Sequence, residues 1–239
     1  MAYFEWSWRS AKSRIAGAAL TWLINGKRGR ATKLAPDGGA GGRLSRRFFE
    51  RYTPDVARDL VGCRLVRVLE GRRLSGTIVE TEAYRGARDP ASHAYRGRTP
   101  RNGVMFGPAG HAYVYFTMGM HYCLNATTEP EGTPAAVLLR AVEPLEGVGA
   151  MAVNRGVSDL RRLAAGPGNL TKALAVDGAL NGEDMVKSGR LFFEERTSSG
   201  PVGASARVGV SAGQNRRWRF YLDGSPFVSR GKPSLPQNP

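Results

Sequence analysis

The feature that most limits the fold of this chain is a series of short strand-like segments, most of which follow one another through tight turns. Each segment is rich in β-branched, aromatic or other apolar residues and is bounded by glycine, proline or polar residues. Strands are expected at residues 65–69, 74–84, 112–117, 122–127, 136–142, 191–194, 207–210 and 218–221. Strands that are neighbours in sequence usually pair antiparallel. The series therefore predicts an α+β fold, a single domain with a curved, mainly antiparallel β-sheet flanked by short helices.

Helices and one long loop complete the expected fold. The first helix opens at Thr53, because Pro54 beside it suits a first helical turn. A second helix is expected to start near Leu145, and a third covers residues 170–175 after a glycine-rich turn. Residues 86–110 contain many Gly, Pro, Asp and Arg residues and no sustained apolar period, which predicts a long ordered loop with short helical turns. Loops of this length usually carry function.

Composition separates the two ends of the chain from its body. Residues 1–42 contain basic residues, a short apolar run and a glycine-rich stretch, and are predicted to be a flexible basic appendage. The apolar run at residues 15–24 is too short to span a bilayer. The appendage is either a DNA-tethering arm or a product of translation from an upstream start codon. The globular domain is predicted at residues 43–231, and a disordered tail at residues 232–239.

The charge of the chain points to a polyanionic partner. Lysine and arginine number 35 against 20 aspartates and glutamates, which gives a net charge of +15. A basic tail that only aids solubility is the simple alternative, but arginines continue through the body of the chain, as at Arg96, Arg98, Arg101 and Arg140. Nucleic acid is therefore the expected partner, and no membrane association is predicted.

The two cysteines, Cys63 and Cys123, lie far apart, and no metal-ligand spacing surrounds them. Neither a disulfide framework nor a metal site is predicted, and each cysteine is expected to be a small buried residue. This cysteine usage indicates a reducing, cytoplasmic setting.

The first candidate for chemistry is the segment that carries Glu80, Glu82 and Tyr84. The two-residue period of a strand places all three side chains on one face. Two carboxylates so close together lie in solvent, pair with arginine or have pKa values shifted for acid–base work. Solvent exposure is the ordinary explanation, but the apolar residues before the pair and the aromatic residue after it argue against that here.

Two further segments could contact DNA. The loop at residues 89–102 combines His93 with three arginines, which suits phosphate contact, although His93 could equally be a surface residue that only forms hydrogen bonds. The strand at residues 112–117 places Tyr113 and Tyr115 on one face and leads to an apolar tip at Met118. Aromatic strands are more often core than site, but exposed apolar tips can act as wedges between base pairs.

Together these segments supply aromatic faces for a base, an apolar wedge, arginines for phosphates and a carboxylate that could activate water. These are the parts needed to flip a base and cut its glycosidic bond. Two alternatives remain: a non-catalytic protein that binds damaged DNA, and a carbohydrate hydrolase that uses Glu80 and Glu82. The surrounding arginines oppose the second alternative.

Several strings, in order along the chain, resemble the alkyladenine (3-methyladenine) DNA glycosylase family. The resemblance runs from about Phe48 to Ser229, and strings in one order are more specific than any single motif. The strings lie at residues 78–84, 89–93, 99–102, 113–115, 123–125, 138–147, 166–170, 207–210 and 225–229.

The resemblance implies one mixed α/β domain with an antiparallel sheet that acts as a monomer, without metal or cofactor, on double-stranded DNA containing damaged purines. Implied substrates are 3-methyladenine, 7-methylguanine and hypoxanthine, although neutral hypoxanthine also needs protonation to leave. The enzyme would be monofunctional and would leave an abasic site. It would work at the bacterial nucleoid, or in the nucleus if the source is eukaryotic.

The resemblance also implies roles for individual residues. Glu82 matches the general base that deprotonates the attacking water, and Arg140 matches the arginine that holds this water. The flipped purine would be held by Tyr84, His93 and Tyr115. Asn125 matches the residue that disfavours the exocyclic amine of normal guanine.

Two positions depart from the family pattern. Met118 lies where the family usually presents a tyrosine for DNA intercalation. Methionine can still act as a wedge but lacks a stacking plane, which predicts weaker retention of flipped DNA. Asn169 stands where a basic residue is usual, so one phosphate contact is expected to be missing.

Overall fold

The computed structural model of the chain describes residues 42–196 and 198–231. Apart from Gly42, the predicted appendage at residues 1–42 lies outside the described residues, and so does the predicted tail at residues 232–239. The strands are β1 (Arg64–Leu69), β2 (Arg72–Arg85), β3 (Ala112–Thr117), β4 (His121–Thr127), β5 (Ala135–Glu146), β6 (Leu191–Glu194), β7 (Val202–Ser205) and β8 (Arg219–Leu222). The α-helices are α1 (Arg46–Phe49), α2 (Thr53–Leu60), α3 (Val148–Arg155), α4 (Leu160–Leu163) and α5 (Pro167–Ala173), and the 3-10 helices are η1 (Gly86–Arg88), η2 (Gly103–Phe106) and η3 (Gly178–Leu180).

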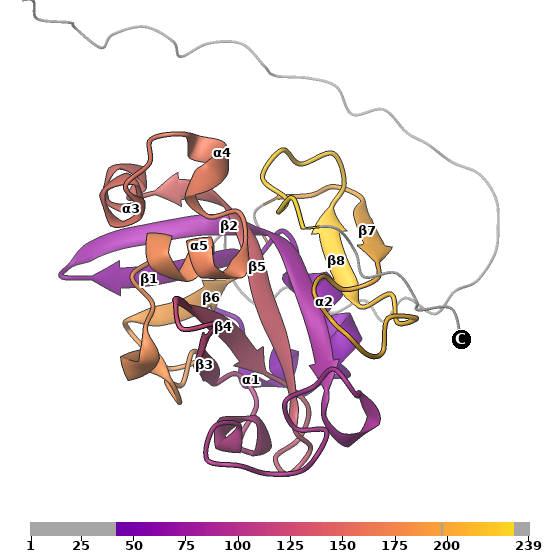
Figure 1. Ribbon diagram of the computed structural model, residues 1–239. Coiled ribbons are helices and arrows are strands. Elements are labelled where there is room, and N and C mark those ends of the chain that lie inside the picture. The colour runs from indigo at the N-terminus through magenta and orange to yellow at the C-terminus, as the bar shows by residue number, and fades with distance from the viewer. Residues whose placement is uncertain (1–41, 197, 232–239) are drawn as a thin grey trace, which may run out of the picture. The chain divides into compact units, whose positions relative to one another are not determined.

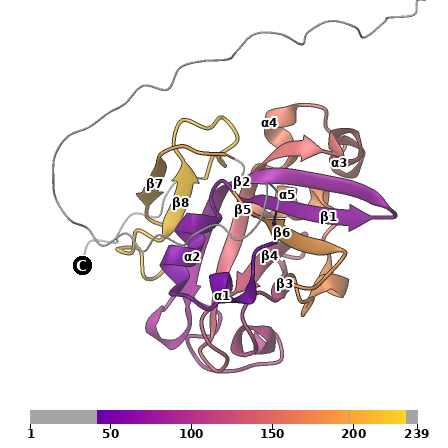
Figure 2. The same ribbon diagram turned by 180° about the vertical axis from the view of Figure 1, so that it is seen from behind.

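The described strands form one eight-stranded sheet in which every pair is antiparallel. The strand order is β3-β4-β5-β2-β1-β6, and the β7–β8 pair joins through β8 to β2 (Figure 1). The predicted fold class, an α+β domain on a curved antiparallel sheet with short helices, is confirmed (Figures 1 and 2).

Strand β2 pairs with three other strands, β1, β5 and β8. Its first half pairs with β1, and its second half pairs with β8 at residues 80–82, while β5 follows it along nearly its whole length. The register with β5 shifts on both sides of Glu80, and such a bulge bends a strand and strengthens its twist. The bend therefore lies at Glu80, next to Glu82, the two carboxylates that the sequence identifies as candidates for chemistry.

The two faces of β2 have different environments. Thr81 donates a 2.7 Å hydrogen bond from its hydroxyl to the carbonyl of Ala57 in α2, and Ala83 belongs to the main apolar core. Glu80 and Glu82 alternate with these residues and therefore project from the opposite face. Helix α2 thus covers one face of the sheet, and the candidate site occupies the other.

Helix α2 begins where the sequence predicts. Pro54 lies in its first turn, Asp55 complements the positive end of the helix dipole, and Val56, Ala57 and Leu60 are buried. The β1–β2 hairpin and the long loop with the helical turns η1 and η2 also follow the prediction.

Helix α5 covers most of the third predicted helix but begins three residues earlier, at Pro167. The proline in its first turn fixes the backbone angle that a helix needs. Next to it, Gly168 lies so close to the His121 ring that a Cβ atom would be 2.5 Å from the ring Cδ2. Any larger residue here would require the His121 side chain to move.

The second predicted helix is present as α3, but it starts three residues later than Leu145, because β5 continues to Glu146, which pairs with Ser75, and Gly147 before the helix adopts a φ of 71°. One predicted strand is wrong. Residues 207–210 are not a strand; the strand before them is β7. Helix α4 was not predicted, because it is a single turn capped by the Asp159 side chain.

Candidate active site

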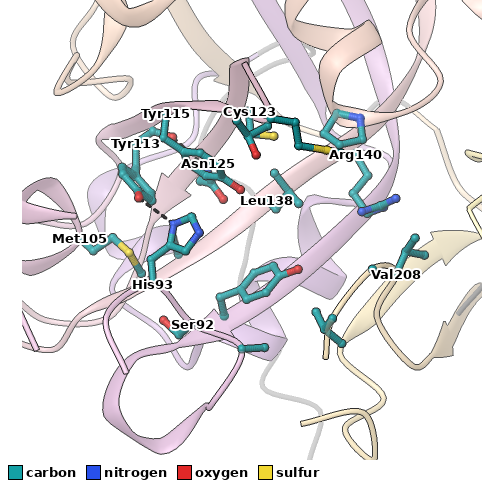
Figure 3. A pocket seen from close by; sticks show the side chains of 18 of the residues that line it. Ser92, His93, Met105, Tyr113, Tyr115, Cys123, Asn125, Leu138, Arg140 and Val208 are labelled. Atoms are coloured by element: carbon teal, nitrogen blue, oxygen red, sulfur yellow. Dashed lines mark hydrogen bonds between the residues drawn. The ribbon is translucent and has the colours of Figure 1, made fainter. Parts of the chain in front are cut away.

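A cavity of about 460 Å³ lies on the face of the sheet opposite α2, within the size range of small-molecule sites. Side chains from β2, β3, β4 and β5 line it, together with the loop after η1 and residues 208–211. In Figure 3, His93 and Tyr113 lie on one side of the cavity, and Arg140 and Val208 lie on the other. Six of the predicted site residues line this cavity: Tyr84, His93, Tyr115, Met118, Asn125 and Arg140.

Glu82 is the seventh predicted site residue, and it is fully buried behind the cavity wall. Its Oε2 accepts hydrogen bonds from the Tyr84 hydroxyl at 2.8 Å and from Arg140 Nη1 at 3.2 Å. Its Oε1 accepts one from the backbone N–H of Val208 at 2.7 Å. Since Tyr84 and Arg140 both line the cavity, Glu82 is in direct contact with two groups that a ligand would touch.

The surroundings of Glu82 favour a proton acceptor. Burial raises the pKa of Glu82, and the hydrogen bonds and the Arg140 charge offset this only in part, so the pKa stays above its usual value. A carboxylate whose basicity is raised, but which an arginine keeps in contact with a cavity, suits general base catalysis.

Glu80 has a different environment from Glu82. It accepts hydrogen bonds from Arg140 Nε at 2.9 Å, from Arg219 Nε at 2.7 Å and from the backbone N–H of Ser229 at 2.7 Å. Burial alone would raise the pKa of Glu80, but the charges of Arg140 and Arg219 outweigh it and the pKa lies below its usual value. Glu80 is therefore a fixed anion that orients Arg140, which bridges the two carboxylates.

Aromatic rings lie on the side of the cavity opposite Arg140 (Figure 3). The His93 and Tyr115 rings lie 4.6 Å apart between centroids and nearly perpendicular, and Tyr113 lies 5.2 Å from Tyr115. His93 Nδ1 and the Tyr113 hydroxyl are 2.9 Å apart. The Arg101 guanidinium lies over the Tyr115 ring at 5.1 Å. Burial and the nearby Arg101 charge lower the pKa of His93, so the imidazole is neutral at pH 7.

Asn125 lies on β4 and is buried at the cavity wall. Its side-chain nitrogen donates a 2.9 Å hydrogen bond to the backbone carbonyl of Tyr113. This bond uses one of the two N–H donors of the amide and fixes the position of the side chain at the wall.

Met118 occupies the tip of the β3–β4 hairpin. The turn has a φ of 53° at Met118 and 68° at Gly119, and the N–H of Met120 donates to the Thr117 carbonyl, as in a two-residue type I′ turn. Met118 is 77% exposed, and Phe116 and Met120 beside it are 50% and 71% exposed. The predicted apolar tip is therefore present at the mouth of the cavity.

A buried ion pair joins two segments of the cavity wall. Arg207 donates to both carboxylate oxygens of Asp89, at 2.6 and 2.8 Å, and both side chains are fully buried. The Arg207 guanidinium also lies 4.6 Å from the centroid of the Tyr84 ring and 5.5 Å from that of Trp218. This pair ties the loop after β2 to the C-terminal part of the chain.

Sequence reasoning missed several groups of the site. Val208, Arg219 and Ser229 contact Glu80 or Glu82 from more than 120 positions away, and nothing local in the sequence links them. Tyr113 was placed beside Tyr115, but its contact with His93 was not foreseen. Both cysteines are free and buried, as predicted, and Cys123 lines the cavity.

Within the described ranges, no group of three or more His, Cys, Asp or Glu side chains could hold a metal ion. In the same part of the chain, no helix is long and apolar enough to cross a membrane.

Comparison with known proteins gives a family for the chain. Residues 47–226 match the family model described as methylpurine-DNA glycosylase. A relative from Carboxydothermus hydrogenoformans named "Putative 3-methyladenine DNA glycosylase" is 47% identical over 189 residues, which cover 78% of this chain and 98% of the relative. A relative of the same name from Methanocella arvoryzae is 48% identical over 194 residues, covering 80% and 97% of the two chains.

The match includes every segment that builds the cavity up to β8, and the relatives align over nearly their whole length. The resemblance noted in the sequence is confirmed. The chain belongs to the methylpurine-DNA glycosylase family, and it is a DNA glycosylase, a hydrolase of DNA repair.

Proposed function

We propose that this protein flips alkylated purines out of duplex DNA into the cavity and hydrolyses their N-glycosidic bonds with a water molecule that Glu82 activates. The substrates are 3-methyladenine and 7-methylguanine, with hypoxanthine as a slower substrate. The observation that carries the proposal is the position of Glu82, buried behind an aromatic cavity and bonded to two residues that line it.

The cavity suits a flat cationic ring. Tyr84, Tyr113 and Tyr115 present aromatic faces, which attract cations through their quadrupoles as well as by stacking. A purine alkylated at N3 or N7 carries a positive charge, and the neutral His93 adds no repulsion. When the Tyr113 hydroxyl donates to Nδ1 of neutral His93, the ring proton lies on Nε2, which gives the cavity a hydrogen-bond donor for the base.

Discrimination against normal guanine is assigned to Asn125. Its nitrogen is held by the Tyr113 carbonyl, so its amide group cannot rotate freely to adapt to a ligand. A fixed side chain at the wall penalises a base whose exocyclic amine finds no room beside it.

In the reaction, the oxygen of water bonds to C1′ of the sugar while the C1′–N9 bond breaks. The electron pair of that bond leaves with the base and cancels the positive charge of an alkylated ring, and the water proton passes to Glu82. The developing oxocarbenium ion is stabilised by the same carboxylate. Arg140 holds Glu82 and reaches the cavity, so it can also orient the water.

The product is expected to be an uncut abasic site. A glycosylase that also cuts the strand needs an amine to form a Schiff base with C1′. The residues that line the cavity in the described part of the chain include no lysine. Hypoxanthine is neutral and needs an added proton to leave, which accounts for its slower expected release.

The test is release of free base in single turnover from duplexes that carry one 7-methylguanine or one hypoxanthine. Wild type is compared with Glu82→Gln, which keeps the size of the side chain and removes its basicity. The matched control is Glu143→Gln, a glutamate of β5 outside the cavity lining. We expect release by wild type and by the control, and none above background by Glu82→Gln.

Release that persists in Glu82→Gln would overturn the role of this residue. Lesion-selective binding without release by wild type would indicate a protein that binds damaged DNA without catalysis.

A further inference from the structure

A second cavity of the described domain, about 560 Å³, is strongly basic and plays no part in the proposed chemistry. It lies between the end of α3, helix α4, the start of α5 and the C-terminal segment at residues 226–230. Its cationic side chains are Arg155, Arg161, Arg162 and Arg230, which we call the arginine basin. Asp159 is the one acidic residue of the lining.

The arginines of the basin form no ion pairs with protein carboxylates in the described part of the chain. The Asp159 side chain accepts a 3.0 Å hydrogen bond from the backbone N–H of Arg161, where it caps α4. Four guanidinium groups around one concave surface repel each other unless an anion lies between them.

The basin is also partly rigid. The half-buried Arg155 donates from Nε to the carbonyl of Leu163 at 2.8 Å and from Nη2 to the carbonyl of Arg162 at 3.4 Å. These bonds hold the guanidinium in one place before any ligand binds. Burial, and to a smaller extent the positive charge of Arg162, lower the pKa of Arg155.

Two chain segments connect the basin to the active-site cavity. At the start of α5, Pro167 lines the active-site cavity and Asn169, two residues later, lines the basin. In the C-terminal segment, Ser229 contacts Arg140 and Glu80, and the next residue, Arg230, lines the basin. The two sites are therefore adjacent, and DNA bound at one of them would extend to the other.

We propose that the arginine basin binds backbone phosphates of the DNA duplex beside the flipped nucleotide, and so fixes the position of the duplex over the cavity. The proposal rests on the proposed function, because that function places the flipped nucleotide in the adjacent cavity. Guanidinium groups suit this role, since each can donate two parallel hydrogen bonds to one phosphate. Asn169 lies in the same basin, so the phosphate contact expected to be missing there is supplied by its arginine neighbours.

The test is the salt dependence of binding to an undamaged duplex, which requires no catalysis. The variant Arg161→Gln/Arg162→Gln changes two exposed side chains of α4. The matched control, Arg47→Gln/Arg58→Gln, removes the same charge from exposed positions on α1 and α2, and α2 covers the other face of the sheet. In both views α1 and α4 lie at opposite ends of the domain (Figures 1 and 2).

Each lost phosphate contact lowers the slope of log K against log salt by about 0.9. We expect the basin variant to bind with a slope smaller by about 1.8 than wild type, and the control to keep the wild-type slope. Equal slopes in the two variants would overturn the proposal. Thermal melts of both variants verify that they are folded.

A second measurement locates the phosphates. Single methylphosphonates, which are uncharged, are placed in turn on either strand within half a helical turn of the lesion. At the phosphates that occupy the basin, the substitution should weaken binding by wild type and have no further effect on the Arg161→Gln/Arg162→Gln variant. If every position weakens both proteins equally, the basin does not bind those phosphates.

The two proposals fail separately. Base release by wild type with no change of slope in the basin variant would reject the basin and retain the glycosylase mechanism. A changed slope without base release by wild type would retain phosphate binding by the basin and reject the glycosylase mechanism.

Discussion

Replacing Asp89 with asparagine should destabilise this protein more than an ordinary surface substitution does. Asp89 and Arg207 are both fully buried, and the carboxylate accepts two hydrogen bonds from the guanidinium as well as the backbone N–H groups of Arg85 and Ala91, each at 3.2 Å. An amide would turn an NH₂ group toward these donors and leave the Arg207 charge without a partner. Breaking one side of a buried ion pair costs about 3 to 5 kcal/mol.

The magnitude can be checked by urea unfolding at pH 7, with Asp223→Asn, an exposed aspartate, as the control. For a domain of this size, the expected loss corresponds to a fall in Tm of roughly 6 to 20 °C. Arg207→Met should cost a similar free energy, because it leaves the Asp89 carboxylate buried and unpaired.

The double variant Asp89→Asn/Arg207→Met gives the sharper test. Methionine can pack between Tyr84 and Trp218 where the guanidinium lay, and no buried charge remains. Its free energy of unfolding should therefore match that of the less damaged single variant instead of falling by the sum of about 6 to 10 kcal/mol. Additive losses, or a loss below about 1 kcal/mol for Asp89→Asn alone, would refute the reasoning that this pair is a coupled buried contact.

Three further predictions concern the rate of the reaction and the affinity for DNA. Because burial raises the pKa of Glu82, base release from 7-methylguanine DNA should fall as the pH drops through that raised value. The acidic limb of the pH–rate profile should therefore lie above the pH range of an ordinary glutamate, and a flat profile would contradict this. Tyr84→Phe removes a hydrogen bond that lowers the pKa of Glu82, so the same limb should move to higher pH, whereas an unmoved limb would show that this contact does not act on the base. Met118→Tyr adds a stacking plane at the exposed tip and should tighten binding of a lesion duplex by roughly 1 to 3 kcal/mol in an equilibrium titration; unchanged affinity would count against a wedge at this position.

The sequence predicts those parts of the site that depend on local geometry. The period of two along β2 places Glu80 and Glu82 on one face, and Arg140 contacts both carboxylates in the structure. The same period in β3 places Tyr113 and Tyr115 together, and their rings are in contact. The single turn Met118-Gly119 follows from a glycine between two short strands.

The environments of the two carboxylates could not be predicted in this way. Glu80 and Glu82 are equivalent in a strand pattern, yet one has a lowered and the other a raised pKa. The difference arises because Arg219 and Ser229 reach only Glu80, from the C-terminal part of the chain. Such contacts depend on the complete fold.

The wrong strand at residues 207–210 has a related cause. The alternation of valines around Gly209 is typical of a strand, but the N–H of Val208 donates to the Glu82 carboxylate, and Arg207 is occupied by Asp89. The neighbouring β7 has Gly, Ala and Ser in its short sequence, a composition with low strand propensity. Contacts with the site, which no local propensity describes, decide the conformation of this segment.

The turn at Met118 and Gly119 has a consequence for how the protein searches DNA. Its backbone is held by two positive φ angles and a closing hydrogen bond between residues of the turn itself, so its shape does not depend on a ligand. The conformational entropy of this tip is lost when the protein folds, so the predicted wedge role would require little more than side-chain rotamers to be fixed on entry into a base stack. If the tip acts as this wedge, it could test successive base steps during sliding without refolding at each one. The time spent at an undamaged step would then be limited by how readily the base pair opens rather than by the ordering of the protein.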